Sequence, residues 1–586
     1  MKTILYYLKP YRFRMLRGFL VKILGTFADL GLPWVLAYIL DDVVPLRRIS
    51  LVLWWGVVMF FLAVAARLLN IRANRMASKV ARDTIEEVRH DLFHKIMYLS
   101  GNQTDRIGIP SLISRLTADS YNVHSMIGRV QRIGVRAPII LMGGILITFT
   151  LEPVLTLVLI ATLPLLSVLV YRVSKKGIPL YTKVSQSVDG VVRIMRENIN
   201  GIRVVKALSK TDYEYGRFKE QNGELAEHEF KAGITMALSG PMMNLILNLG
   251  LTAIVVVGAY RVNAGASMPG RIVAFLSYFT MILHAMMAIT RVFVDISKAA
   301  ASANRIGLVL SEGDELLVRA KGADKLGGED AAEIPPRIEF LNVSFGYHAA
   351  SGGEDKLCLK NLNFRIMPGE SLGILGATGS GKSTVINLLM RFYDVNSGSV
   401  RVDGRDVREY TPRKLREKFA VVFQNDTVFH DSIMENICFG REIGEEEVMA
   451  AAKDACAYDF IMEKEDGFLS EAAIGGANLS GGQKQRLLIT RALAGKPEIL
   501  VLDDSSSALD YKTDAKLRRA IRKHYAGTNI VMVAQRVSSL MGLDHILVLE
   551  DGEAIGYGRH EELLKDCEVY REIYEVQMGS MEGMAQ

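Results

Sequence analysis

Cysteine is scarce in this chain of 586 residues, which contains only four. Cys358, Cys438, Cys456 and Cys567 all lie in the second half and form no Cys-x-x-Cys pair. That spacing argues against a zinc site and against a disulfide framework. It favours reduced thiols in the cytosol.

The chain also lacks the marks of a secretory signal and any strong excess of charge. Its first residues, MKTILYYLKPYRFRML, are basic but contain no apolar core followed by a small-residue cleavage site, so we expect no signal peptide. Aromatic side chains among these basic residues predict a helix lying at a membrane surface, or else a frayed terminus. The net charge of +6 gives no reason to expect nucleic acid as a partner.

Apolar sequence, in contrast, is abundant in the first half. Hydrophobic residues make up 49% of the chain and the mean hydropathy is +0.19, which is high for a soluble protein. A helix needs about 20 mostly apolar residues to cross a bilayer. Six segments come close to that length: residues 18–40, 49–69, 133–151, 154–173, 240–260 and 272–296. Lysines and arginines near the ends of these segments place the N-terminus in the cytoplasm.

The sequence between the spans is also organised. Residues 71–99 and 184–208 carry apolar residues at helical spacing without proline, so we expect the spans to continue as helices into the cytoplasm. Each extension is followed by a polar turn, at residues 101–110 and 209–217. The pattern predicts a multi-pass protein of the cell membrane.

The composition changes beyond the last span. Residues 318–336, VRAKGADKLGGEDAAEIPP, are rich in glycine, charge and proline and predict a linker. Short strands then alternate with helical patterns, which is typical of an α/β domain. We therefore predict a six-helix membrane domain over residues 1–317 and a cytoplasmic α/β domain over residues 337–586.

A glycine-rich loop carries the first chemical signal. The stretch GATGSGKST lies between the apolar SLGIL and the helical pattern VINLLMRF. This G-x-x-x-x-G-K-S pattern between a strand and a helix predicts a P-loop, whose backbone N–H groups surround phosphate oxygens at a helix N-terminus. Lys382 would reach the β- and γ-phosphates, and the Ser383 hydroxyl would bind Mg²⁺. The residues predicted to bind ATP here are Gly376, Ala377, Thr378, Gly379, Ser380, Gly381, Lys382, Ser383 and Thr384.

A second signal is the apolar run ILVL that ends in two carboxylates, Asp503 and Asp504. A run of this kind predicts a buried strand with its acids at the rim of the sheet. Asp503 is placed to hold Mg²⁺ from its second coordination shell or through water. Asp504 stands where a general base would polarise the attacking water.

The stretch LSGGQKQR, residues 479–486, completes the set. A P-loop, this signature, an aspartate-ending strand followed by SALD, and six preceding spans together resemble the ABC transporters. More narrowly, the chain resembles an exporter-type half-transporter, over almost its whole length. The resemblance implies an all-α polytopic membrane domain followed by an α/β nucleotide-binding domain. It also implies an ATPase that uses ATP and Mg²⁺.

Further roles follow from the resemblance alone. It implies that Tyr347 stacks on adenine and that Gln424 contacts both Mg²⁺ and the loops of the membrane domain. It places Asp510 at a dimer interface, and it makes the two polar turns coupling helices that dock onto nucleotide-binding domains. The implied Mg²⁺ ligands are Ser383, Gln424 and Asp503. The residues that would grip the γ-phosphate held by an opposite subunit are Ser480, Gly481, Gly482 and Gln483.

Three positions depart from the family pattern. Asp504 replaces the catalytic glutamate, Gln535 replaces the switch histidine, and Ile474 stands where many members carry an acid. A base misplaced by about 1 Å can cost ~10²-fold in rate, and a glutamine cannot carry the positive charge of an imidazolium. We therefore expect a catalytically weak site at Asp504, Gln535 and Gln424. Because the signature is intact, we also expect a heterodimer in which a different half-transporter supplies the active base.

The expected cargo is an amphipathic or drug-like compound, a lipid or a peptide. Polar residues within the spans are candidate contacts, namely Asp29, His284, Asn244 and Asn248. Asp29, with only Lys22 as a charged neighbour on its span, either attracts a cation or forms an interhelical hydrogen bond. The alternative function is an ATP-gated channel or a regulatory subunit, although the spans offer only scattered polar groups.

Overall fold

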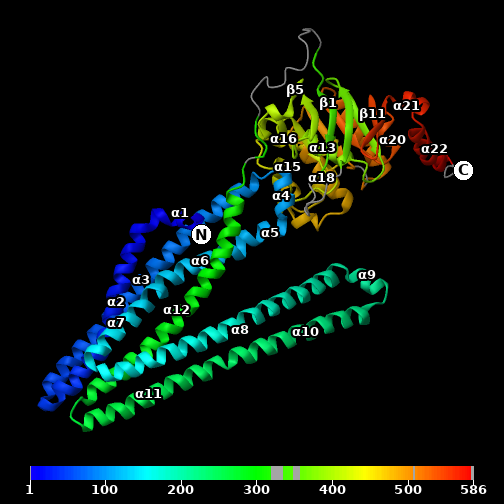
Figure 1. Ribbon diagram of the computed structural model, residues 1–586. Coiled ribbons are helices and arrows are strands. Elements are labelled where there is room, and N and C mark those ends of the chain that lie inside the picture. Colours follow the sequence, from blue (N-terminus) through cyan, green and yellow to red (C-terminus); the bar gives the residue numbers. More distant parts are fainter. Residues whose placement is uncertain (1, 314, 319–333, 348–356, 506–507, 583–586) are drawn as a thin grey trace. The chain divides into compact units, whose positions relative to one another are not determined.

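The computed structural model describes the chain except for residues 1, 314, 319–333, 348–356, 506–507 and 583–586. It forms two compact units (Figure 1). One comprises Met1–Met97 and Pro110–Glu312, and the other comprises Tyr98–Ile109 and Gly313–Gln586. Most of the predicted linker lies outside the described residues, so the predicted domain boundaries stay predictions.

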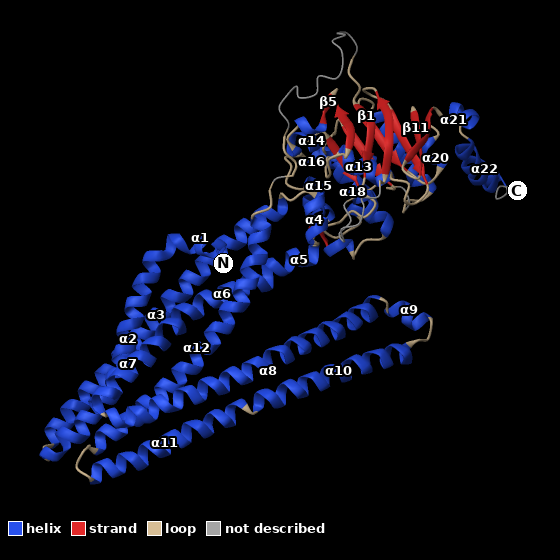
Figure 2. Ribbon diagram, viewed as in Figure 1, coloured by secondary structure: helices blue, strands red, loops and turns tan. Residues whose placement is uncertain are grey.

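The described residues of the first unit are helical (Figure 2). Six of its helical stretches are long and apolar enough to cross a membrane, which confirms the six predicted spans. Two π-helical turns, η4 (Arg115–Asp119) and η5 (Val130–Gly134), continue the third stretch between α5 and α7. The helices are α1 (Lys2–Leu8), α2 (Arg12–Tyr38), α3 (Ile49–Met97), α5 (Ile109–Ser114), α6 (Ser120–Arg129), α7 (Val135–Leu151), α8 (Pro153–Asn200), α9 (Ile202–Ala207), α10 (Thr211–Ala237), α11 (Ser239–Asn263) and α12 (Pro269–Leu310).

Several of these helices are longer than a bilayer requires. At 1.5 Å per residue, the 49 residues of α3 extend roughly 70 Å, more than twice a hydrocarbon core of about 30 Å. Helices α8 and α10 run side by side, joined by α9 (Figure 1). The polar turn expected at residues 209–217 is shorter than predicted, because α9 ends at Ala207 and α10 begins at Thr211; its role as a coupling helix stays a prediction. Ser209, in the left-handed region with φ +53°, lies between the two helices.

The second unit is built on two larger sheets and a two-stranded ribbon of β7 and β8 (Figure 2). The six-stranded sheet has the order β12-β11-β3-β10-β9-β6 and is parallel except for β12. The four-stranded sheet, β2-β1-β4-β5, is antiparallel. The strands are β1 (Ile338–Phe345), β2 (Leu359–Ile366), β3 (Ser371–Gly376), β4 (Ser397–Val402), β5 (Arg405–Asp406), β6 (Phe419–Val422), β7 (Asp431–Ser432), β8 (Glu471–Ala472), β9 (Ile499–Asp503), β10 (Asn529–Val533), β11 (His545–Glu550) and β12 (Glu553–Gly558).

Helices cover these sheets and form two apolar cores with them. Along β9, Ile499 and Val501 enter a core shared with the four-stranded sheet and α13, whereas Leu500 and Leu502 enter a core shared with α15, α16 and α18. Burial on both faces explains why this strand is continuously apolar. The helices are α4 (Gly101–Ile107), α13 (Lys382–Leu389), α14 (Pro412–Arg416), α15 (Ile433–Cys438), α16 (Glu445–Asp454), α17 (Tyr458–Met462), α18 (Gly481–Ala494), α19 (Tyr511–His524), α20 (Val537–Leu540), α21 (His560–Asp566) and α22 (Glu568–Glu582).

The order of the parallel strands positions the chemistry. Strands β3, β10, β9 and β6 are consecutive neighbours, so their carboxyl ends meet at one edge of the sheet. Ligands bind at this edge in open α/β sheets. The P-loop follows β3, Gln535 follows β10, Asp503 ends β9 and Gln424 follows β6.

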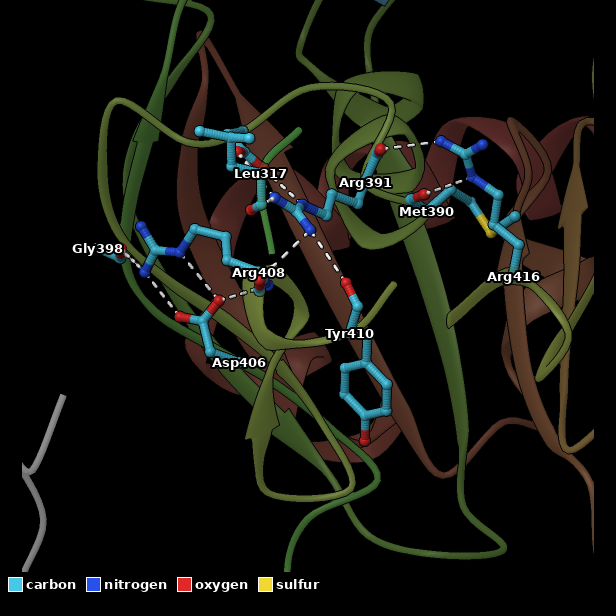
Figure 3. Close-up of polar contacts among 9 residues, drawn as sticks. Leu317, Met390, Arg391, Gly398, Asp406, Arg408, Tyr410 and Arg416 are labelled. Atoms are coloured by element: carbon cyan, nitrogen blue, oxygen red, sulfur yellow. Dashed lines mark hydrogen bonds and ion pairs between the residues drawn. The ribbon is translucent and has the colours of Figure 1, made fainter. Parts of the chain in front are cut away.

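A buried arginine fixes the segment that enters this unit. Arg391 is fully buried, and its guanidinium donates to the carbonyl of Leu317 at 2.8 Å and to that of Tyr410 at 3.1 Å (Figure 3). Its Nε also lies 2.8 Å from a carboxylate oxygen of Asp394. A buried charge is tolerated only when it is paired and hydrogen-bonded, so these contacts hold the chain at Leu317 against the turn that follows α13.

Candidate functional site

One cavity of about 310 Å³ gathers most of the predicted nucleotide site. Its walls come from the P-loop, from the ends of three neighbouring strands and from the segment after β1. The predicted residues that line it are Tyr347, Thr378, Gly379, Gly381, Lys382, Ser383, Thr384, Gln424, Asp503, Asp504 and Gln535.

The P-loop backbone demands glycine at particular positions. Gly379 and Gly381 have φ values of +88° and +100°, which L-residues with side chains rarely adopt. A Cβ at Gly376 would lie 2.4 Å from the carbonyl oxygen of Leu549. Lys382 donates to the carbonyls of Gly376 and Ala377, at 2.9 and 2.7 Å. Burial lowers the pKa of Lys382, while Asp503 and Asp504 oppose that shift.

Asp503 and Ser383 form the group that suits a hard cation. The Ser383 hydroxyl donates to Asp503 at 3.1 Å, and Asp503 is buried at 5% exposure. Burial raises the pKa of Asp503, and the hydrogen bond from Ser383 works against that rise. Among the described residues, no group of three or more His, Cys, Asp or Glu residues forms a metal site. The hydroxyl and carboxylate fit Mg²⁺, which keeps waters and takes its other ligands from phosphates.

The two positions that depart from the family pattern contact each other. The side-chain amide of Gln535 donates to Oδ2 of Asp504 at 3.2 Å. Asp504 follows β9 with φ +48°, and its backbone N–H donates to the carbonyl of Val533 at 3.0 Å. Burial raises the pKa of Asp504, although Lys382, Arg536 and the Gln535 bond favour its charged form. The aspartate and the glutamine therefore form one hydrogen-bonded pair at the cavity wall.

Tyr347 and Gln424 stand at other parts of the wall. The Tyr347 hydroxyl donates to Thr384 at 3.2 Å and accepts from Asn387 at 3.1 Å, so both of its partners lie on α13. Gln424 is exposed in the turn after β6. Adenine stacking by Tyr347 and Mg²⁺ contact by Gln424 stay predictions.

The signature residues lie outside this cavity, at the start of α18. Ser480 caps the helix, accepting from the backbone N–H of Gln483 at 3.3 Å, and Gln483 in turn accepts from the Ser480 N–H at 2.9 Å. A Cβ added to Gly481 would meet nothing within 4 Å. Asp510 caps α19 by accepting from the backbone N–H of Thr513 at 2.9 Å. The signature glycine thus faces open space within its own chain.

Some contacts within the second unit carried no sequence signal of their own, although the resemblance had implied that the segment 101–110 docks onto a nucleotide-binding domain. Cys358 and Val533 also line the nucleotide cavity, without a motif to mark them. The Gly101 N–H donates to the Phe392 carbonyl at 3.2 Å, and the Tyr393 hydroxyl donates to Asp105 at 2.6 Å. Helix α4, which lies in the first predicted coupling segment, therefore packs on the turn after the P-loop helix. Partners so far apart in sequence leave no local signal.

The candidate substrate residues are arranged differently from what the sequence suggested. Asp29 has a charged partner on another span, because it lies 2.9 Å from the guanidinium of Arg136, and it also accepts from Asn70 at 3.2 Å. Lys22 donates to Asn70 at 2.8 Å. These contacts link α2, α3 and α7 and favour the interhelical role for Asp29.

His284 lies elsewhere in the membrane unit. It lines a cavity of about 400 Å³ together with Arg136 and apolar residues of α7 and α12. Asn244 and Asn248 are exposed along α11, one turn apart. Substrate contact by these residues stays a prediction.

Comparison with known proteins identifies the family. The model described as "ABC transporter transmembrane region" matches residues 15–286, and the one described as "ABC transporter" matches residues 359–507. The chain is 36% identical to an uncharacterised ABC transporter ATP-binding protein of Bacillus subtilis, YfiB, over 99% of each chain. An ATP-dependent lipid A-core flippase of Syntrophus aciditrophicus is 26% identical, over 98% of this chain and 94% of the flippase.

A solved structure shares the fold. A bacterial Atm1-family ABC exporter with ATP bound superposes with a TM-score of 0.79 at 24% identity, over 97% of this chain and 98% of that one. The six spans and the α/β domain follow in the predicted order. The chain belongs to the ABC transporter family, as an exporter-type half-transporter that binds nucleotide and couples ATP hydrolysis to transport.

Proposed function

We propose that this chain is the subunit with the weaker ATP site in a heterodimeric exporter of amphipathic compounds. The observation that carries this proposal is the hydrogen bond from Gln535 to Asp504. The short carboxylate is engaged by a neutral amide, in a cavity where its burial favours the protonated form. A general base must lie within hydrogen-bond reach of the attacking water, and the Asp504 carboxylate is one methylene shorter than a glutamate and already accepts a hydrogen bond from the Gln535 amide.

The other residues of the cavity would bind ATP without requiring hydrolysis. Lys382 would exchange its two carbonyl partners for phosphate oxygens. Ser383 and Asp503 would hold Mg²⁺, with Gln424 beside them, and the metal would neutralise phosphate charge. Tyr347, fixed through its hydroxyl to α13, would offer its ring to adenine.

The proposal of a heterodimer rests on the contrast between the P-loop site of this domain, which has the short Asp504, and its signature sequence. The signature is intact, and Gly481 leaves room for a phosphate presented by another chain. The first-turn N–H groups of α18 are a ready anion site. A second, different half-transporter with a glutamate and a histidine at the corresponding positions would then hydrolyse ATP against this signature.

The proposed cargo is amphipathic, and a lipid is the leading class. The cavity of about 400 Å³ joins apolar walls to Arg136 and His284, which suits a molecule with one polar end. Related proteins carry the name lipid A-core flippase, which also supports a lipid. Export would move it across the cell membrane, away from the cytoplasmic side.

Affinity purification of this chain from its native membranes tests the assembly. We expect a second ABC half-transporter in equal amount, identified by mass spectrometry, with glutamate after its own aspartate-ending strand. The paired complex should transport labelled lipids or amphipathic dyes in vesicles. Recovery of this chain as a homodimer with brisk ATP turnover would overturn the proposal.

A further inference from the structure

The C-terminal helix makes a two-point contact beside the nucleotide site. We call residues 535–538, which follow β10, the switch segment. The side-chain amide of Gln577, on α22, accepts from the Val537 N–H at 2.8 Å. The same amide donates to the Gln535 carbonyl at 2.9 Å. One side chain therefore satisfies a donor and an acceptor two residues apart on the switch segment, as a neighbouring strand would.

Helix α22 is firmly anchored in the domain. Tyr570 is fully buried, and its hydroxyl lies 2.7 Å from Nδ1 of His560. The Tyr574 ring also packs against His560, with centroids 5.4 Å apart. Tyr570 belongs to the same apolar core as Val537 and Leu540 of α20. The helix that carries Gln577 is thus a fixed support rather than a loose end.

The rest of the switch segment is held by two side chains of α19. Arg518 donates to the Ser538 carbonyl at 3.0 Å, and the Arg536 guanidinium lies over the Tyr511 ring at 4.9 Å. The Gln535 side chain reaches Asp504 from a backbone that has left the sheet. The direction of the Gln535 side chain therefore depends on the backbone contact that Gln577 supplies.

We propose that Gln577 is a positioning residue for the ATP site: it fixes the backbone of Gln535 so that the Gln535 side chain meets Asp504 and the terminal phosphate. The proposal rests on the function proposed above for Asp504 and Gln535. Gln577 is not among the residues that line the nucleotide cavity, so it should act on the rate of hydrolysis or the retention of ATP rather than on the first binding step. Displacement of α22 would change that rate by the same route.

A double-mutant cycle between Gln577→Leu and Gln535→Ala tests this in the full transporter complex in lipid nanodiscs. Two quantities are measured: steady-state ATP turnover with its KM, and the rate at which radiolabelled ATP leaves this chain's site. Gln577→Leu should change the rate of ATP turnover or the rate of ATP release about tenfold, because small displacements at such sites are costly. The KM for ATP should stay within about twofold of the wild-type value. In the Gln535→Ala background it should add nothing.

Two further variants separate positioning from stability. Gln577→Glu keeps the acceptor for Val537 but sets a carboxylate oxygen against the Gln535 carbonyl. It should therefore reproduce the effect of Gln577→Leu on turnover or release, with little change in side-chain volume. Glu575→Gln, on the same helix and exposed, should match the wild type. Melting temperatures of all variants should agree within a few degrees.

The outcomes discriminate between the two proposals. A loss from Gln577→Leu that is equally large in the Gln535→Ala background would show a purely structural role and overturn the inference. So would an unchanged Gln577→Leu variant beside an altered Gln535→Ala variant. If Gln535→Ala itself alters neither quantity, the proposed role of the site fails, and this inference falls with it.

Discussion

At the scale of single residues, we propose that Asp504 and Gln535 limit ATP hydrolysis at this chain's own site. They contact each other at 3.2 Å. Asp504→Glu with Gln535→His should raise turnover at this site about tenfold or more, because the longer carboxylate reaches the water and the imidazole carries charge. The measurement is ATP turnover by a complex whose partner base has been replaced by glutamine. Unchanged turnover would mean that the partner's signature limits this site.

A second residue-level prediction concerns Asp29. Asp29→Asn should leave Arg136 without its counter-charge, and removal of one partner from such a contact typically costs about 1–3 kcal/mol. We expect a lower yield of assembled complex and a lower melting temperature, with ATP affinity unchanged. The double variant Asp29→Asn with Arg136→Gln should recover part of the loss. Normal stability combined with selective loss of cationic cargo would instead make Asp29 a substrate residue.

The sequence predicted these residues unevenly. The P-loop and the carboxylates at the end of β9 were found because glycine, lysine, serine and aspartate recur there at fixed spacing. The pairing of Asp29 with Arg136 was not predictable, since 107 residues separate them and no pattern marks the contact. Gln577 was missed for the same reason: a surface glutamine on a C-terminal helix carries no signal until the fold places it.

At the scale of elements, α4 is sensitive to a small change at its first residue. A Cβ at Gly101 would lie 2.7 Å from Cζ of Tyr393 and 3.0 Å from the Phe392 carbonyl oxygen. Gly101→Val should therefore force α4 away from the turn after α13. Because α4 follows α3 in the chain, we expect ATP turnover to persist while cargo movement per ATP falls several-fold.

Paired measurements of transport and hydrolysis in the same vesicles check this. Tyr393→Phe is the milder companion: it removes one hydrogen bond to Asp105, worth about 1 kcal/mol, and should reduce coupling only slightly. Equal losses of hydrolysis and transport in Gly101→Val would indicate a damaged domain rather than a broken connection.

The ends of helices could be predicted from the sequence where the composition changes sharply. The predicted boundary between the spans at residues 133–151 and 154–173 is confirmed, because α7 ends at Leu151 and α8 begins at Pro153. The extension predicted over residues 184–208 is interrupted, because Gly201 ends α8 and the short helix α9 lies between it and the left-handed Ser209. The spacing of apolar residues alone marked neither Gly201 nor Ser209 as the end of a helix.

At the scale of the whole molecule, the proposed division of labour makes an asymmetric prediction. Gly481→Trp should abolish turnover by the complex, because a Cβ there meets nothing within 4 Å of its own chain and the indole would occupy the space proposed for a nucleotide brought by the partner. Lys382→Ala should weaken one nucleotide site and leave appreciable hydrolysis. The measurement is turnover by each variant complex, with the melting temperature as control. Equal inactivation by both substitutions would favour two equivalent sites.

The contacts of Arg391 and Tyr393 also bear on biosynthesis. Asp105 emerges from the ribosome 288 residues before Tyr393, the residue whose hydroxyl it binds. Leu317 is likewise synthesised before Arg391, whose guanidinium donates to its carbonyl. During translation the spans can therefore enter the bilayer while α4 still lacks its support. A ribosome that stalls before the turn after α13 leaves a membrane-inserted chain with an unfinished cytoplasmic end, a natural substrate for quality-control proteases.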